Sequence, residues 1–115
     1  MASAEMPIFT RTFDFLAWLL PLSNSFPRAH RHTLTRRLLD AAFDLREHLE
    51  QANVRREHGR RASLSQADDA LARVRLYLRL ATRFGWVSDG QYAHAAGMVT
   101  EIGQLLGGWH KASAT

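Results

Sequence analysis

Residues 64–84 of the chain read LSQADDALARVRLYLRLATRF, and this stretch decides the fold. An α-helix turns by about 100° per residue, so residues three and four apart share a face. The stretch therefore carries two apolar stripes, the first made of Leu64, Ala67, Leu71, Val74, Leu78 and Ala81 and the second of Leu76, Leu80 and Phe84. One stripe packs a helix onto a core. The second stripe predicts that the helix is also buried on another side. In so short a chain, we expect another subunit to cover that side.

A row of three arginines, Arg75, Arg79 and Arg83, lies between the two stripes. No acidic residue lies at helical spacing within the row. Like charges four residues apart destabilise a helix by about 0.2–0.5 kcal/mol per pair, and a polyanion would turn this repulsion into binding. The row is therefore the first candidate for a nucleic-acid interface.

The composition restricts the class of protein. A chain of 115 residues is one domain with room for a core, and the absence of cysteine excludes disulfides and thiolate metal sites. No apolar run of 18 residues and no secretory signal are present, so we expect a cytoplasmic protein with no membrane partner. Fourteen arginines and one lysine contribute to a net charge of +4. This excess fits phosphate binding, although a GC-rich genome also enriches arginine and alanine.

Helical periodicity extends over the whole chain, and no stretch alternates in the manner of a strand. Four helices are predicted, over residues 8–22, 27–58, 63–84 and 89–109. Pro21 kinks or shortens the end of the first helix. Gly59 and Gly85 each fit the position just past a helix end.

Two serines mark the starts of the later helices. Ser63 with Gln66 and Ser88 with Gln91 have the spacing of a capping box. Short loops between long amphipathic helices predict an all-α, antiparallel, up-down-up-down four-helix bundle, which we expect to assemble as a barrel-like homo-oligomer. The predicted parts are a disordered tail, the bundle and a C-terminal tail, at residues 1–7, 8–110 and 111–115.

The last predicted helix has a face of small residues opposite its core stripe, made of Ala93, Gly97, Thr100, Gly103 and Gly107. Glycine within a helix costs up to about 1 kcal/mol relative to alanine. We therefore expect another backbone to pack closely against this face.

The sequence offers no catalytic residues, no metal site and no cofactor site. No Glu-x-x-His pair occurs, and His30 and His32 point about 200° apart on a helix, so they do not chelate together. No serine lies on a strand-turn-helix elbow, and no phosphate-binding glycine loop is present. Glu101 has two interpretations, as the buried partner of an arginine from another helix or as a boundary residue in water.

The remaining arginines fall into groups. Arg28, Arg31 and Arg36 crowd the start of the second helix, where the helix dipole favours anions. In an antiparallel bundle this end also holds Arg79 and Arg83, so the two groups are predicted to share one region. Other arginines flank the loop after the second helix, namely Arg55, Arg56, Arg60 and Arg61. Two more are expected in ordinary surface pairs, Arg73 with Asp69 and Arg46 with nearby glutamates.

Several short segments resemble the accessory variability determinant proteins of diversity-generating retroelements. They are Phe26-Pro27, Arg75 to Ala81, Gln91-Tyr92, Glu101-Ile102-Gly103 and Leu106-Gly107-Gly108-Trp109. The likeness runs from about Phe9 to Lys111. The family is similar to four-helix proteins encoded in intervening sequences of large-subunit ribosomal RNA genes, and the sequence separates the two branches imperfectly. The chain departs from the family in using arginine almost exclusively where the family mixes in lysine.

The resemblance implies a barrel-like homopentamer without catalytic activity. It further implies that the protein binds the element's reverse transcriptase and nucleic acid, in a complex that copies a template RNA mutagenically. The basic positions Arg75, Arg79 and Arg83 become the candidates for that surface, with Arg28 and Arg31 behind them. For the Glu-Ile-Gly and Gly-Gly-Trp segments the resemblance implies a structural role.

Three hypotheses follow. The first is a non-enzymatic adaptor that presents arginines to RNA or cDNA and to a polymerase. The second is an intervening-sequence-type protein or scaffold that acts by protein–protein contacts alone. The third, a small nuclease or hydrolase, ranks last because no cluster of acids is available to hold Mg²⁺.

Overall fold

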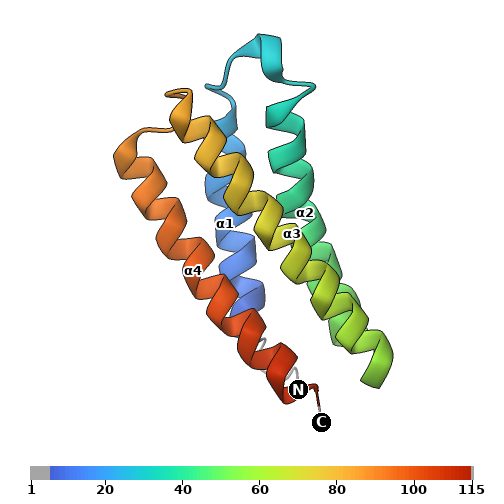
Figure 1. Ribbon diagram of the computed structural model, residues 1–115. Coiled ribbons are helices and arrows are strands. Elements are labelled where there is room, and N and C mark those ends of the chain that lie inside the picture. Colours follow the sequence, from blue (N-terminus) through green and yellow to red (C-terminus); the bar gives the residue numbers. More distant parts are fainter. Residues whose placement is uncertain (1–5, 115) are drawn as a thin grey trace.

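The computed structural model describes residues 6–114 and contains no strand in that range. Its α-helices are α1 (Pro7–Ser23), α2 (Leu34–Val54), α3 (Glu57–Arg83) and α4 (Asp89–Ala112), with one turn of 3-10 helix, η1 (Arg28–His30), before α2. Successive α-helices run antiparallel, so α1 begins and α4 ends at the same end of the bundle (Figure 1). The predicted all-α class and four-helix bundle are confirmed.

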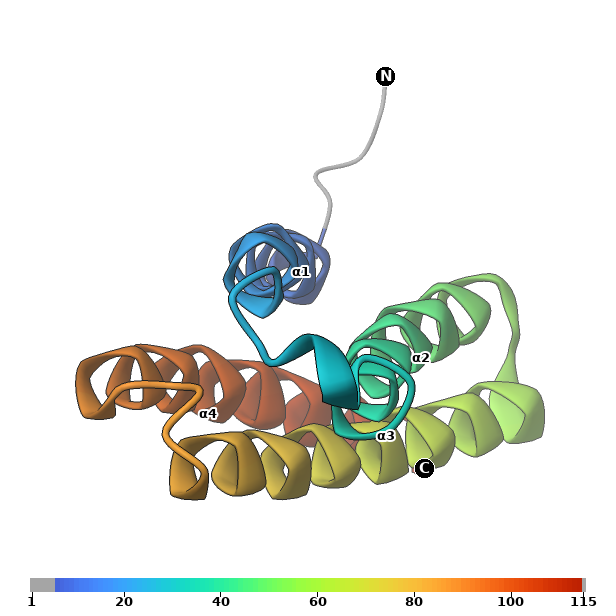
Figure 2. The ribbon, with the colours of Figure 1, turned by 90° about the horizontal axis from the view of Figure 1, so that it is seen from above.

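The helices differ in how closely they pack. The longest interface joins α2 and α3, and α4 lies along the other side of α3. Helix α1 lies across this layer and contacts both α2 and α4 (Figure 2). The molecule measures 44 × 24 × 23 Å. The start of α2 and the end of α3 lie at the same end of its long axis (Figure 1).

The core sits under the first stripe of residues 64–84, as predicted. All six residues of that stripe are at most 2 % exposed. They meet Leu38, Leu45 and Leu49 of α2 and Ile102 and Leu106 of α4 in one apolar cluster. Burying a leucine side chain contributes about 1.5–3 kcal/mol, so this stripe accounts for much of the driving force for folding.

The predicted boundary between the second and third helices is wrong. Helix α2 ends at Val54, Arg55 and Arg56 are extended, and α3 begins at Glu57 instead of near Ser63. Two guanidinium groups explain the earlier break, because Arg60 Nε donates to the carbonyl of Ala52 at 2.9 Å and Arg55 Nη1 donates to Ser63 Oγ at 2.9 Å. The first bond satisfies a backbone carbonyl in the last turn of α2. Ser63 lies inside α3, so it is not the N-cap of a helix.

Two helix signals are confirmed, whereas the predicted start of the second helix at residue 27 is wrong, Gly59 lies inside α3 and Pro21 does not end α1 early. Gly85 has φ +78° immediately after α3, and Ser88 forms a capping box with Gln91 at the start of α4. Pro21 lies in the last turn of α1, which continues to Ser23. The second helix begins at Leu34 because residues 28–30 form η1 instead of a first α-turn. Of the predicted N-terminal tail, residues 1–5 lie outside the described residues.

The small-residue face of α4 has little cover within the chain. A Cβ atom added at Gly97 or Gly107 would meet no atom within 4 Å, whereas one at Gly103 would meet Arg75 Nη2 at 2.7 Å. The expected close approach is thus made at Gly103 alone among these three, and by a side chain instead of a backbone. No helix within residues 6–114 is long and apolar enough to cross a membrane.

Candidate nucleic-acid interface

The second apolar stripe stays on the outside of α3. Leu76 is 49 % exposed, Leu80 38 % and Phe84 60 %. Leu76 and Leu80 lie on the helix itself, whereas Phe84 is the C-cap residue and turns toward Trp86, with ring centroids 5.5 Å apart. The surface of α3 therefore offers two exposed leucines beside the arginine row, and Phe84 belongs to the end of the bundle.

The arginine row, Arg75, Arg79 and Arg83, is exposed on α3. Among residues 6–114 no hydrogen bond or ion pair engages any of the three guanidinium groups. Arg83 lies in the last turn of α3, and the negative end of the helix dipole stabilises a cation there by about 0.3–1 kcal/mol. This compensates part of the repulsion along the row and leaves the charges available to an external anion.

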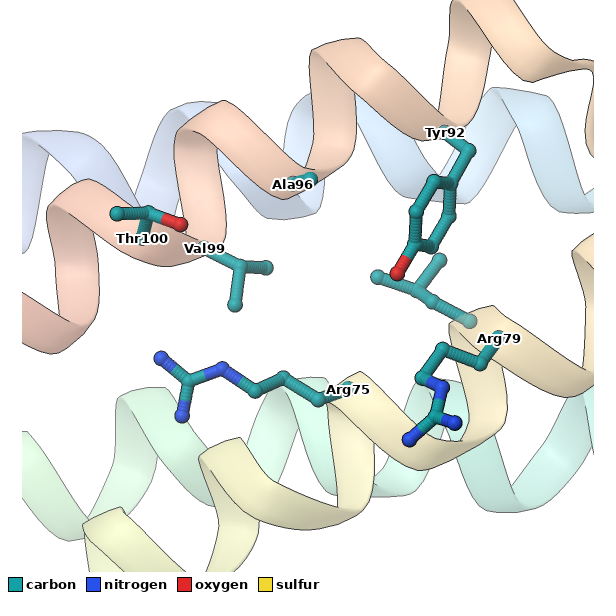
Figure 3. Close-up of a pocket in the computed structure, with 7 residues that line it drawn as sticks. Arg75, Arg79, Tyr92, Ala96, Val99 and Thr100 are labelled. Carbon is teal, nitrogen blue, oxygen red and sulfur yellow. The ribbon is translucent and has the colours of Figure 1, made fainter.

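A groove between α3 and α4 receives the first two arginines of the row. It has a volume of about 220 Å³ and is lined by Arg75, Leu78, Arg79, Tyr92, Ala96, Val99 and Thr100. Arg75 extends along the groove toward Val99 and Thr100, and Tyr92 reaches from α4 toward α3 (Figure 3). The two guanidinium groups, the phenol and the hydroxyl are hydrogen-bond donors of the kind that bind phosphate oxygens.

A second recess lies on the outer surface of α3. It encloses about 270 Å³ between Leu76, Arg79, Leu80 and Arg83. Arg79 lines both this recess and the groove. It is therefore the residue that joins the two into one continuous cationic surface.

The arginines near the start of α2 are only partly brought to this surface. Arg28 opens η1 and Arg31 follows it, and both are exposed. The segment is held to the end of α3 through His30 and Trp86, whose ring centroids lie 5.1 Å apart. Arg28 and Arg31 thus share the bundle end with Arg83, as predicted. Arg36 is exposed in the first turn of α2, and within residues 6–114 no hydrogen bond or ion pair links it to the row.

Several other arginines are occupied within the fold. Arg46 pairs with Glu50 at 2.9 Å and donates to the carbonyl of Phe9 at 2.8 Å. Arg60 caps the end of α2 and lies over the ring of Trp109 at 5.9 Å. Arg73 pairs with Asp44 of α2 at 3.4 Å, so the predicted pair with Asp69 is wrong. The reason is geometric, because α2 packs so closely on α3 that it offers a carboxylate across the interface.

Glu101 is paired, but at the surface. Its carboxylate lies 2.8 Å from Arg11 Nε of α1. The Glu101 side chain is 48 % exposed and the Arg11 side chain 42 %. The hydrogen bond that Arg11 donates to Glu101, reinforced by the charge of the carboxylate, raises the pKa of Arg11 above its ordinary value. The expected pairing of Glu101 with an arginine from another helix is confirmed. The expectation that this pair is buried is wrong.

Sequence reasoning missed Tyr92 and Thr100 as parts of the groove. Both lie on the side of α4 that faces α3, a placement that depends on how the two helices are rotated. Within residues 6–114 no three His, Asp or Glu side chains are grouped to bind a metal ion.

Gly103 leaves room for the guanidinium group of Arg75, so a larger residue at this position should displace that group. In Gly103→Ala the new Cβ would meet Arg75 Nη2 at 2.7 Å, so the flexible guanidinium must shift from its place in the groove. We expect the unfolding free energy to rise by up to about 1 kcal/mol, because alanine is the better helix former. Binding of a short RNA should weaken at the same time, by no more than severalfold.

The matched control is Gly97→Ala, where the added Cβ meets nothing within 4 Å. It should bring a similar gain in stability and leave RNA binding unchanged. Chemical denaturation and fluorescence anisotropy measure the two quantities. Equal RNA binding by Gly103→Ala and the parent protein would show that the position of Arg75 in the groove is irrelevant to binding.

The fold and the site together define a small four-helix protein with an unpaired cationic surface. A family model described as bAvd-like matches residues 6–113. The chain therefore belongs to the bAvd-like family, that of the accessory variability determinants, and the resemblance drawn from its sequence is confirmed.

Among solved structures, the chain is similar to a Bacteroides thetaiotaomicron protein of unknown function from the S23 ribosomal protein family. The match has a TM-score of 0.83 at 16 % identity and covers 91 % of this chain and 96 % of that one. At this identity the likeness concerns the fold alone. None of the curated proteins matches the sequence.

Proposed function

We propose that the protein is a non-enzymatic accessory factor of a diversity-generating retroelement. In this role it binds the element's reverse transcriptase together with template RNA or cDNA, and so supports mutagenic retrohoming. The observation that carries the proposal is the arginine row of α3, exposed and without a protein partner among residues 6–114, in a chain of the bAvd-like family.

The division of the arginines supports this proposal. Half-buried arginines such as Arg46, Arg60 and Arg73 have partners in the fold. Those of the row line open recesses with apolar and hydroxyl-bearing neighbours. A guanidinium that serves stability is expected to be paired, whereas one that serves an external phosphate is left accessible.

Assembly forms a second part of the proposal. Leu76 and Leu80 are exposed on α3. Exposed apolar side chains of this kind are suited to contacts between copies, and we propose a barrel-like homopentamer. Repetition of the arginine row around such a ring would multiply modest phosphate contacts by avidity.

Salt dependence of RNA binding tests the nucleic-acid role. Each phosphate contact by a cation releases a counterion, so three contacts to a single strand give a log–log slope of about −2. Affinity should then fall about twentyfold between about 50 and 200 mM salt. Fluorescence anisotropy with a labelled single-stranded RNA measures this slope. No binding at low salt would contradict the proposal.

Contact with the reverse transcriptase is tested separately, by co-purification with the polymerase of the same element. The exposed leucines of α3 also suit a scaffold that acts on proteins alone. Unrelated RNA distinguishes the two functions, because it should compete with the polymerase only if the arginine surface serves both partners. Co-purification that is insensitive to RNA, together with absence of RNA binding, would favour the scaffold.

A further inference from the structure

Four aromatic rings gather where α3 ends. The ring centroid of Trp86 lies 5.6 Å from Phe26, 5.1 Å from His30 and 5.5 Å from Phe84. Phe26 is buried beneath, while Phe84 and His30 are exposed. We call these four residues the aromatic cluster. Two exposed rings therefore lie beside a half-buried tryptophan and a buried phenylalanine.

The backbone holds the aromatic cluster firmly in place. Gly85, at φ +78°, reverses the chain after Phe84, and the amide of Trp86 then donates to the carbonyl of Ala81 at 2.9 Å. This is the hydrogen bond of a Schellman motif, which fixes the residue after the glycine against the helix end. Trp86 is thereby set beside Phe84, so the rings are arranged before any ligand arrives.

A cavity opens beside the rings. Its volume is about 420 Å³, and its walls are His30, Leu34, Phe84 and Trp86. Small-molecule pockets measure about 300–1,000 Å³ and are lined mainly by apolar and aromatic groups, as this one is. Its lining carries no arginine, so its chemistry suits a flat, apolar-faced group and not a phosphate.

Three arginines are close neighbours along the chain of residues that line the cavity. Arg83 directly precedes Phe84, while Arg28 opens η1 and Arg31 directly follows it, and all three are exposed. Among the described residues, 6–114, Arg31 is engaged only with the neighbouring imidazole of His32, at 3.2 Å. The nearest acid along the chain after Phe84 is Asp89, in the first turn of α4. Aromatic rings combined with nearby arginines are typical of proteins that bind single-stranded nucleic acid.

We propose that the aromatic cluster binds an unpaired base of a single-stranded nucleic acid. The base stacks on Phe84, Trp86 or His30, and Arg28, Arg31 and Arg83 contact the phosphates on either side. A duplex hides its base faces and could not use this cavity, so the ligand is single-stranded. The inference rests on the proposed nucleic-acid role and adds what the bundle end contributes to it, namely contact with bases in addition to phosphates.

The test compares a short oligo-uridine RNA with a strand of equal length and charge that lacks bases. The protein variants are Phe84→Leu, which removes the ring and keeps the apolar bulk, and Phe84→Tyr, which keeps the ring. Phe84 is 60 % exposed, so neither change should disturb the fold. We expect Phe84→Leu to weaken RNA binding about five- to tenfold and to leave binding of the abasic strand unchanged. Phe84→Tyr should bind RNA as the parent protein does.

The matched control is Phe13→Leu, at a phenylalanine of α1 that is 64 % exposed. It should have no effect on RNA binding. Equal binding of the two strands by the parent protein, or equal losses in the Phe84 and Phe13 variants, would overturn the stacking inference and leave phosphate binding intact. A loss of assembled mass in Phe84→Leu with unchanged RNA binding would overturn it in favour of a protein contact. Failure of the parent protein to bind either strand would overturn the proposed function as well.

Discussion

Replacement of Arg79 and Arg83 by alanine is expected to weaken RNA binding about thirtyfold at low salt. This figure takes roughly 1 kcal/mol for each lost guanidinium–phosphate contact at an exposed site. The salt slope should become shallower by about 1.4, because two fewer counterions are released from a single strand. Anisotropy titrations at several salt concentrations measure both effects. Helicity by circular dichroism should be unchanged, since neither side chain has a partner among residues 6–114.

A charge-matched control separates the site from the net charge of the protein. Arg56→Ala with Lys111→Ala also removes two exposed positive charges, but at the opposite end of the bundle. This variant should bind RNA within about twofold of the parent protein, apart from the long-range effect of charge, which is screened beyond about 10 Å at 0.1 M salt. If the two double variants lost affinity equally, the arginine row would have no special role and binding would depend on net charge alone.

Leu71→Ala is expected to destabilise the fold by about 2–5 kcal/mol. Leu71 is fully buried on the first stripe of α3, where truncation removes apolar contacts and leaves a cavity. The free energy of unfolding of such a domain is about 5–15 kcal/mol, so this loss is a large part of the total stability. Denaturant unfolding at several protein concentrations measures it, because assembly would make the apparent stability depend on concentration.

Leu76→Ala provides the comparison on the second stripe of the same helix. Leu76 is 49 % exposed, so its loss should cost well under 1 kcal/mol of unfolding free energy in the dissociated chain. It should instead reduce the assembled mass in light scattering, if copies associate through Leu76 and Leu80. An equal destabilisation by both variants would mean that the second stripe belongs to the fold of a single chain. An unchanged mass for Leu76→Ala would remove this face from the interface between copies.

Much of the fold was predictable because it depends on local periodicity. Residues three and four apart share a helix face whatever the rest of the chain does, so the buried stripe of α3 could be read directly. Gly85 and the Ser88–Gln91 capping box end and begin helices through contacts within a few residues. The exposed second stripe followed from the same rotation. Family membership was also apparent from short segments of the sequence.

The candidate site was predictable only in part. The arginine row was found because its members are spaced along one helix and lack acidic neighbours. Tyr92 and Thr100 were missed because their place in the groove depends on the rotation of α4 against α3. The partner of Arg73 was mistaken for the same reason, since Asp44 reaches it from α2.

The sequence by itself determined the helical class, the two faces of α3 and the row of cations, because these depend on angles between neighbours on one helix. Only the tertiary structure decided where α2 gives way to α3, since the bonds of Arg55 and Arg60 join residues on both sides of the break. It alone decided which arginines are occupied and which are free. It also brought Phe26, His30 and Trp86 together, because a contact between distant segments depends on the packing of whole helices.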